Sequence, residues 1–478
     1  MVAGIGKADR PLRQRILVEK WLAGWLLWLL HRQDVRPVRV VKGDEIASSG
    51  QGFVTFQKSS VLSATPLKVI IIGAGVAGLV AARHLEEAGI SPIIIDAEDR
   101  VGGRLKTDRE QGFLLDRGFQ VLLTEYPEVK RYLDLEALAI NTYRPGAHVH
   151  TRTQHFRFVD PLREPAQVIR SALSPLGVLA DKVKLGQLGL RLRAASNEAC
   201  FEGYESKPTI DYLREIGFTE QIIERFFRPF FGGIFLEQEL ATPAAMFRYI
   251  FKMFGSGSAA LPAGGIEAIP RQLAAQLQQS EFRFNQRVRN VNGNQVTLDD
   301  GSQLSADGII LACAPDRLVE GLSGQTEGWK STTNLYYYSS RRLRENRLIN
   351  LVFDPTSTIN TFTVLDEVSP NYRGEKQGGS LISITLKKSL GSDEGIAQVE
   401  QDFLRHSRLP SDALTFLRRY NIERALPKIS QVAFKQDPSH SRLTESIFLA
   451  GDQQLNGSLD AAMRSGRLAA LGLLEAAS

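Results

Sequence analysis

Cysteine is nearly absent from this chain, since its 478 residues include only Cys200 and Cys313. The two lie far apart in the sequence, and neither belongs to a Cys-x-x-Cys pair. This spacing excludes a disulfide framework and a dithiol redox relay. It also excludes a zinc site built from thiolates, because such sites use closely spaced cysteines.

Long apolar runs and a strong net charge are also missing. The apolar run Trp21–Leu30 is too short to cross a bilayer, because a spanning helix needs about 20 such residues. The formal net charge is only +5 at pH 7. Small arginine clusters at 341–344 and 287–289 are more typical of a solvated surface with some phosphate contacts than of a nucleic-acid interface. We therefore predict no spanning segment and no nucleic-acid partner.

The run Trp21–Leu30 contains three tryptophans, and arginine and lysine residues lie on both sides of it. This composition suits a helix that lies in a membrane interface, although a helix packed against the protein is an alternative. We expect a cytoplasmic protein in which residues 1–66 form an N-terminal extension. Peripheral membrane contact through Trp21–Leu30 is one interpretation of that extension.

A glycine-rich turn between an apolar strand and a helix is the most informative feature that is present. Gly73, Gly75 and Gly78 follow the strand with the spacing G-x-G-x-x-G. The first glycine permits a tight turn, the second lets the backbone approach a pyrophosphate, and the third lets the helix pack close to the sheet. The helix presents unpaired N–H groups and its positive dipole end to the anion. We predict a dinucleotide site here that includes Val76 and Ala77.

A second apolar strand, residues 93–95, ends in a carboxylate. Asp96 stands near the distance from the turn at which an acidic side chain binds ribose hydroxyls, and Ala97 follows it. Gly102, Gly103 and Arg104 come soon after, and an ordinary nicotinamide-binding domain does not need them. Arg104 can pair with phosphate as a fixed cationic fork, while the glycines let the backbone pass close by.

The segment that begins at Asp96 and continues through Gly118, Phe119 and Gln120 resembles the FAD-binding signature of the flavin amine oxidase superfamily. That superfamily includes monoamine and polyamine oxidases, protoporphyrinogen oxidase and the phytoene desaturases. The resemblance implies that the dinucleotide is FAD. No cysteine lies near the expected flavin, so we expect FAD to be bound noncovalently.

Two further regions resemble the same superfamily. Residues 446–470 are similar to its closing strand–helix motif, which implies that Asp452, after Gly451, meets the FAD ribitol. The helix that begins with Leu459 would then point its N-terminus at the flavin, and Ser458 is a good N-cap for it. Residues 261–275 resemble a glycine–glycine helix start, and the resemblance implies that Val288 touches adenine through its backbone.

The resemblance implies an α/β protein with a Rossmann-like FAD-binding domain (GR2-type) and a second substrate domain of mixed sheet and helix. Residues 67–128, 262–330 and 430–478 would form the FAD-binding domain. Residues 129–261 and 331–429 would form the substrate domain. We find no second dinucleotide turn, so we expect an organic substrate to reduce the flavin and oxygen, a quinone or another acceptor to reoxidise it.

The substrate is less constrained than the cofactor. The aromatic segment Phe226–Phe235 predicts either the core of a helical region or an apolar tunnel for a flat or polyene-like molecule. Leu455–Gly457 stands where amine oxidases of the superfamily usually place an aromatic residue. Thr332–Asn334 occupies the strand on which many of them carry a lysine. These departures favour a small lipophilic substrate, either isoprenoid or carotenoid-like or tetrapyrrole-like, over an amine.

Two alternatives to this function are kept. One is an amine oxidase. The other is a protein that binds lipid-bearing partners without redox chemistry, since the Rab GDP-dissociation inhibitors resemble the same fold. The sequence assigns neither the catalytic side chains nor the oligomeric state.

Three histidines, His148, His150 and His155, lie in a segment that alternates like a strand or hairpin. No carboxylate stands at ligand spacing within this run. We therefore predict no metal site from the sequence.

Overall fold

A five-stranded parallel sheet carries the glycine-rich turn. The computed structural model describes residues 67–160, 163–320, 322, 326–376 and 378–478, which belong to one compact unit. The strands, in sheet order, are β10 (Glu281–Arg283), β2 (Ile93–Ile95), β1 (Val69–Ile72), β14 (Gly308–Leu311) and β20 (Ile447–Leu449). The central strands are runs of isoleucine and valine because both faces of a parallel sheet are covered.

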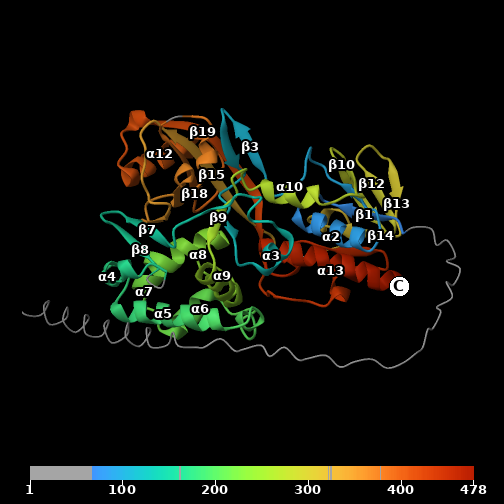
Figure 1. Cartoon of the computed structure of the whole chain (residues 1–478), viewed down its shortest axis with the longest axis horizontal. Coiled ribbons are helices and arrows are strands. Elements are labelled where there is room, and N and C mark those ends of the chain that lie inside the picture. The colour runs from blue at the N-terminus through green and yellow to red at the C-terminus, as the bar shows by residue number, and fades with distance from the viewer. Residues whose placement is uncertain (1–66, 161–162, 321, 323–325, 377) are drawn as a thin grey trace, which may run out of the picture. The chain divides into compact units, whose positions relative to one another are not determined.

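Each face of this sheet has its own cover (Figure 1). Val69, Ile71 and Ile310 point toward a helical layer, whereas Ile70 and Ile309 point toward a three-stranded meander. The helices of that layer are α2 (Val76–Glu87), α10 (Ala268–Ala275) and α13 (Leu459–Ala477). The meander consists of β11 (Val288–Asn292), β12 (Gln295–Leu298) and β13 (Gln303–Ser305).

A second, seven-stranded sheet is mostly antiparallel. Its strands, in order, are β19 (Leu414–Pro427), β15 (Trp329–Ser339), β18 (Ser380–Leu386), β17 (Ile359–Val364), β16 (Ile349–Phe353), β7 (Gly146–Thr151) and β8 (His155–Val159). Only β16 and β7 pair in parallel. Helix α12 (Glu394–Ser407) buries Val399 and Phe403 against one face. The β8 strand stands at an edge of this sheet.

Helices and two small sheets complete the described chain. The helices are α3 (Pro127–Tyr132), α4 (Val168–Ala172), α5 (Leu179–Ala194), α6 (Thr209–Ile216), α7 (Glu220–Ile222), α8 (Arg228–Phe235), α9 (Ala244–Ser256) and α11 (Leu365–Val368). One small sheet pairs β3 (Thr107–Glu110) with β4 (Phe113–Asp116). The other has the order β5 (Leu122–Leu123), β9 (Ala259–Leu261) and β6 (Asn141–Thr142).

The aromatic segment Phe226–Phe235 packs as a core. Phe227 and Phe231 are fully buried. The ring of Phe231 lies with its centroid 4.6 Å from that of Phe247 on α9. Because these rings pack against one another, the structure favours the core interpretation over a tunnel at this segment.

The predicted α/β class, with a Rossmann-like sheet and a second region of mixed sheet and helix, is confirmed. The division of residues 67–478 into two domains stays a prediction. The run Trp21–Leu30 lies outside the described residues. No helix in the part of the chain that the structure describes is both long and apolar enough to cross a membrane.

Helix α13 lies directly on α2, and a glycine permits that contact (Figure 1). A Cβ added to Gly466 would stand 2.1 Å from the backbone oxygen of Ala77. Real Cβ atoms do not approach an oxygen so closely. The two helices can therefore lie at this separation only while residue 466 lacks a side chain.

Replacement of this glycine tests the contact. We expect Gly466→Ala to lower the free energy of unfolding by on the order of 1–3 kcal/mol, because one helix must shift. Gly186→Ala in α5 is the matched control, since its added Cβ meets no atom within 4 Å. It should raise stability by about 0.5–1 kcal/mol, the difference in helix propensity. Thermal melts of both variants check the prediction, and equal melting temperatures would contradict it.

Candidate functional site

Two of the three predicted turn glycines are required by the chain itself. Gly73 has φ +110°, and its N–H donates to the Ile95 oxygen at 2.8 Å. A Cβ on Gly78 would lie 2.0 Å from the oxygen of Gly73. The turn and the close packing of α2 on β1 therefore depend on these two residues.

Gly75 is different, because nothing in the protein demands a glycine there. Its φ of −77° suits any residue. An added Cβ would meet only the Cα of Gly103, at 3.9 Å. The space beside Gly75 is therefore not filled by other atoms of the protein and is open to a ligand. This open approach fits a ligand that presses on the backbone at the start of α2.

The start of α2 is also suited to an anion. No side chain of the described chain caps it, and its first turn holds no acidic residue. The backbone N–H groups of the first turn, which include those of Val76 and Ala77, have no partner within the helix. With the positive end of the helix dipole, they form the kind of site that binds phosphate.

Asp96 stands beside this turn. Its carboxylate accepts hydrogen bonds from the N–H groups of Ala74, at 2.7 Å, and Glu98, at 2.8 Å. The main-chain oxygen of Asp96 accepts a hydrogen bond from the N–H of Gln286 at 3.0 Å. This bond holds the segment just before Val288 close to Asp96 and Ala97. The structure thus brings the predicted ribose and adenine residues to one end of the site.

Arg104 and Asp452 meet at the other end. Their side chains form an ion pair, although they are far apart in the sequence. Asp452 is buried, while the Arg104 side chain is partly exposed and donates to the Ala425 oxygen at 3.1 Å. The Gln120 side chain donates to the Arg104 oxygen at 3.0 Å. Predicted residues from three segments therefore converge.

The predicted N-cap of α13 is present. Ser458 Oγ accepts from the N–H of Ala461 at 3.0 Å and donates to the Asn456 side chain at 2.7 Å. Leu459 is the first residue of the helix and is partly buried. Gly451, with φ +132°, donates its N–H to Ser465 Oγ at 2.9 Å and so ties the preceding turn to the helix.

Gly118 and Phe119 lie slightly apart from these contacts. A Cβ on Gly118 would stand 2.7 Å from Ile422 Cδ1, so this glycine lets strand β19 approach. The ring of Phe119 packs edge-on against Tyr143, with 6.3 Å between centroids. Both residues join the loop to the seven-stranded region.

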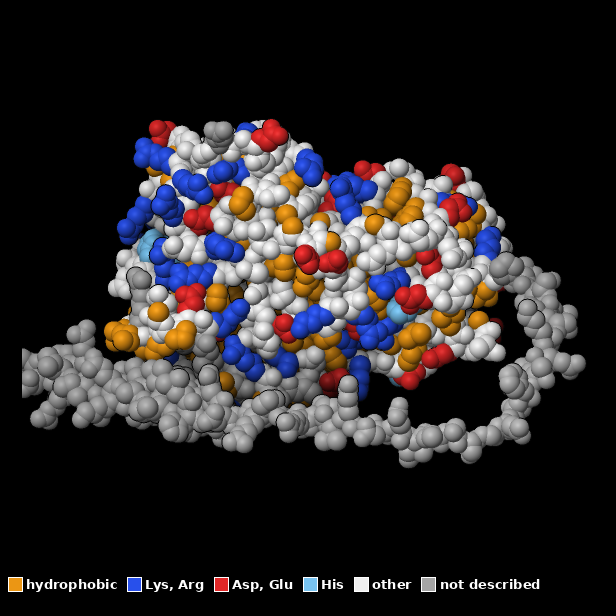
Figure 2. Space-filling model, in the orientation of Figure 1, with side chains coloured by type: hydrophobic (Ala, Val, Ile, Leu, Met, Phe, Trp, Pro, Cys, Tyr) orange, Lys and Arg blue, Asp and Glu red, His pale blue; other side chains and the backbone are white. Residues whose placement is uncertain are grey.

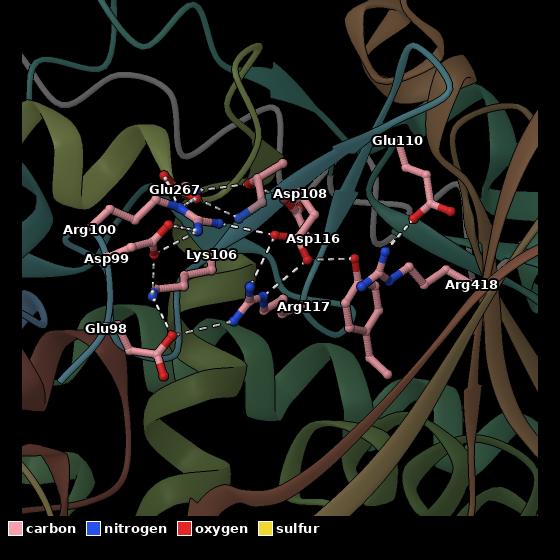
Figure 3. A network of polar contacts seen from close by, with 12 residues as sticks. Glu98, Asp99, Arg100, Lys106, Asp108, Glu110, Asp116, Arg117, Glu267 and Arg418 are labelled. Atoms are coloured by element: carbon pink, nitrogen blue, oxygen red, sulfur yellow. Dashed lines mark hydrogen bonds and ion pairs between the residues drawn. The ribbon is translucent and has the colours of Figure 1, made fainter. Parts of the chain in front are cut away.

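Sequence reasoning passed over the buried polar network that holds the loop after Asp96 (Figure 3). The carboxylate of Glu267 is almost fully buried and accepts from Arg100 Nε at 3.0 Å and from the Thr107 N–H at 2.9 Å. Lys106, also buried, donates to Glu98 at 3.0 Å. The network ties the loop to the start of α10 and so fixes Gly103 and Arg104.

Asp116 is a second buried acid of this network. Its carboxylate accepts from Thr107 Oγ1 and the Tyr372 hydroxyl, both at 2.6 Å, and from the Ile266 N–H at 3.0 Å. Burial raises the pKa of Asp116 to about 6 against these donors. The residue therefore joins three distant segments while its charged form is disfavoured.

Lys330 is a second residue that sequence reasoning missed. It lies on β15 next to Trp329, whose ring is 5.7 Å from the guanidinium of Arg104. Lys330 Nζ donates to Thr242 Oγ1 at 3.0 Å, and burial lowers the pKa of this lysine. It stands two residues before Thr332, close to the segment in which the resemblance led us to expect a lysine, and its burial against Thr242 is seen only in the fold.

Known proteins resemble this chain over most of its length. The model of the family described as "Flavin containing amine oxidoreductase" matches residues 76–474. The chain is 21% identical over 514 residues to 15-cis-phytoene desaturase of Solanum lycopersicum, covering 93% of this chain and 85% of that protein. It is 24% identical over 483 residues to a probable zeta-carotene desaturase of Synechococcus elongatus, covering 86% and 99%.

A solved structure shares the fold. A putative protoporphyrinogen oxidase from Exiguobacterium sp. 255-15 superposes with a TM-score of 0.63 at 18% sequence identity. The match covers 86% of this chain and 99% of that one. At this identity, the likeness shows the fold alone.

The raised pKa of Asp116 predicts a pH-dependent stability. The folded protein binds a proton at this site between pH 3.8 and about 6, whereas the unfolded chain does not. The protonated Asp116 carboxyl therefore stabilises the fold fully below pH 3.8. The free energy of unfolding falls by about 3 kcal/mol as the pH rises from there through about 6. The stability advantage of the wild type over Asp116→Asn should shrink accordingly between pH 4 and 7. Melting temperatures of both proteins measure it, and a constant difference would contradict the assignment.

Because the backbone at Gly75 is unobstructed, we predict that a side chain there prevents ligand retention without unfolding the protein. We expect Gly75→Val to fold, because its Cβ would meet only the Gly103 Cα, at 3.9 Å, and to lose no more than about 1–2 kcal/mol of stability, since valine is a poorer N-cap than glycine. The variant should retain less than about a tenth of the dinucleotide, since that side chain fills the place of the pyrophosphate. Gly186→Ala serves as a control. A Gly75→Val protein that retains a full complement of dinucleotide would refute the assignment.

Proposed function

Because this chain belongs to the flavin containing amine oxidoreductase family, we propose that it binds FAD noncovalently and oxidises a small lipophilic substrate. The substrate would be isoprenoid or carotenoid-like, or tetrapyrrole-like. The observation that carries the cofactor assignment is the open backbone at Gly75 above an uncapped helix start. A protein that binds lipid-bearing partners without flavin has no use for that arrangement.

The residues present fit FAD. The turn from Gly73 to Gly78 would hold the pyrophosphate, and Asp96 the ribose. Arg104 and Asp452 would hold the part of FAD that lies toward α13, with Ser458 fixing the start of that helix. Burial raises the pKa of Cys313 to about 12, so its thiol stays protonated, which supports noncovalent binding.

Bound flavin would supply the hydride acceptor, which no side chain of this protein can provide. The chain's own contribution would be binding, orientation and the exclusion of water. The network around Glu267 and Asp116 serves orientation, because it fixes the loop that carries Arg104. We assign no catalytic side chain.

The lipophilic substrate class draws its support from the relatives and from the closing motif. Two of the relatives are named for the desaturation of phytoene and zeta-carotene. Where amine oxidases usually place an aromatic residue, this chain has Leu455 and Asn456, both buried. The Asn456 side chain donates to the main-chain oxygen of Ala433 at 3.0 Å, so its amide makes a structural contact.

Amine oxidation remains the alternative because of Lys330. A partly buried lysine with a lowered pKa stands on the strand where the superfamily often carries one, two residues before Thr332. This observation is compatible with an amine oxidase, and the substrate experiment below separates the two functions.

Peripheral membrane contact also belongs to the proposal. Hydrophobic side chains gather at α4 on the face shown in Figure 2. Ile169 and Leu173 are 64% and 62% exposed, and Val178 and Leu179 lie exposed nearby. Such a cluster suits contact with a membrane, in which a lipophilic substrate would be dissolved.

Anaerobic bleaching of the flavin tests the function. A carotenoid precursor such as phytoene, supplied in detergent micelles, or a reduced tetrapyrrole should abolish the yellow absorption of the purified holoprotein. A diamine such as putrescine should leave it unchanged. Bleaching by the amine alone would replace the proposal with the alternative. A flavin that neither lipophilic class reduces would contradict the proposal.

A further inference from the structure

The hairpin of β7 and β8 gathers three imidazoles on one face of the seven-stranded sheet. His148 and His150 are two residues apart on β7, so their side chains share a face. His155 on β8 pairs directly with His150 in the antiparallel register. The ring centroids of His148 and His155 lie 4.2 and 4.6 Å from that of His150. One nitrogen from each ring lies within 4.8 Å of the other two.

Hydrogen bonds to two of these rings fix which nitrogen carries the proton. His148 Nδ1 lies 2.5 Å from Glu345 Oε2, and His150 Nε2 lies 2.9 Å from Asn350 Oδ1. A carboxylate oxygen and an amide oxygen only accept, so each of these ring nitrogens donates. The lone pair of His148 is therefore on Nε2, and that of His150 is on Nδ1.

The lone pair of His150 has no partner. His150 is 1% exposed, and its Nδ1 is a buried atom without a hydrogen bond among the described residues. A buried acceptor left unpaired costs free energy, because it has lost its hydrogen bond to water without gaining another. A neutral imidazole with a free lone pair is the form that binds metals.

We propose that His148, His150 and His155 bind a divalent transition metal ion, and that the ion is Zn²⁺. Three imidazole nitrogens are a known ligand set for this ion, with a fourth position open to water. Glu345 and Asn350 supply the outer hydrogen bonds that usually orient metal-bound histidines. The ion would join β8, the edge strand, to β7.

This inference departs from the sequence prediction that no metal is bound. That prediction rested on the absence of a carboxylate within the histidine run. The fold supplies the carboxylate from Glu345, far along the chain, and it contacts His148 as a hydrogen-bond acceptor rather than as a ligand. The register of the hairpin supplies the third imidazole.

Zinc binding by the full chain, expressed without a histidine tag, tests the proposal. The protein is stripped with a chelator, dialysed against Zn²⁺ and assayed by elemental analysis, and its affinity is measured by competition with a chromogenic chelator. We expect about one tightly bound zinc ion per chain. Zinc should also raise the melting temperature, because it binds the folded protein.

Matched variants locate the ion. His155→Ala should lose the tight zinc ion, and His440→Ala, which removes an exposed histidine elsewhere, should keep it. Glu345→Gln should weaken binding by about 10- to 100-fold. His155→Ala suits the test because its ring is only partly buried, and equal melting temperatures in chelator show that it folds. Absence of tight zinc in the wild type, or full retention by folded His155→Ala, would overturn the proposal.

Discussion

The structure depends on a close approach of three backbone segments at the glycine-rich turn. Gly73 turns the chain out of β1, Gly78 lets α2 rest against that turn, and Gly466 lets α13 rest against α2. A single added methyl group at Gly78 or Gly466 would stand about 2 Å from a backbone oxygen. The contacts of α2 with the turn and of α13 with α2 are therefore possible only because these positions lack a side chain.

That packing leaves one position free, and the candidate site is built around it. Gly75 faces no atom that a methyl group would disturb, yet the loop that bears Gly103 and Arg104 passes close by. Buried hydrogen bonds of Thr107 to Glu267 and Asp116 hold the loop in place, within the network that Figure 3 shows. The proposed dinucleotide would need this combination, because its pyrophosphate approaches the backbone closely.

The local parts of this arrangement were predictable from sequence. The strand, turn and helix around Gly73–Gly78 depend on neighbours in the chain, and so does the Ser458 cap. Contacts between distant segments were predictable only where the family resemblance supplied them, as for Arg104 and Asp452. Glu267 and Asp116 look like ordinary acids in the sequence. The contact of Lys330 with Thr242 and that of Glu345 with His148 appear only in the folded chain. The aromatic segment Phe226–Phe235 was compatible with core or tunnel until its packing was known.

The visible absorption spectrum of the purified wild-type protein, followed by release of its chromophore with acid or heat, tests the central claim most directly. The account predicts a yellow protein that releases intact FAD. Release without proteolysis would also show that no covalent bond holds the flavin. A colourless protein that fails to take up added FAD would contradict the account, since the open backbone at Gly75 would then serve some other ligand.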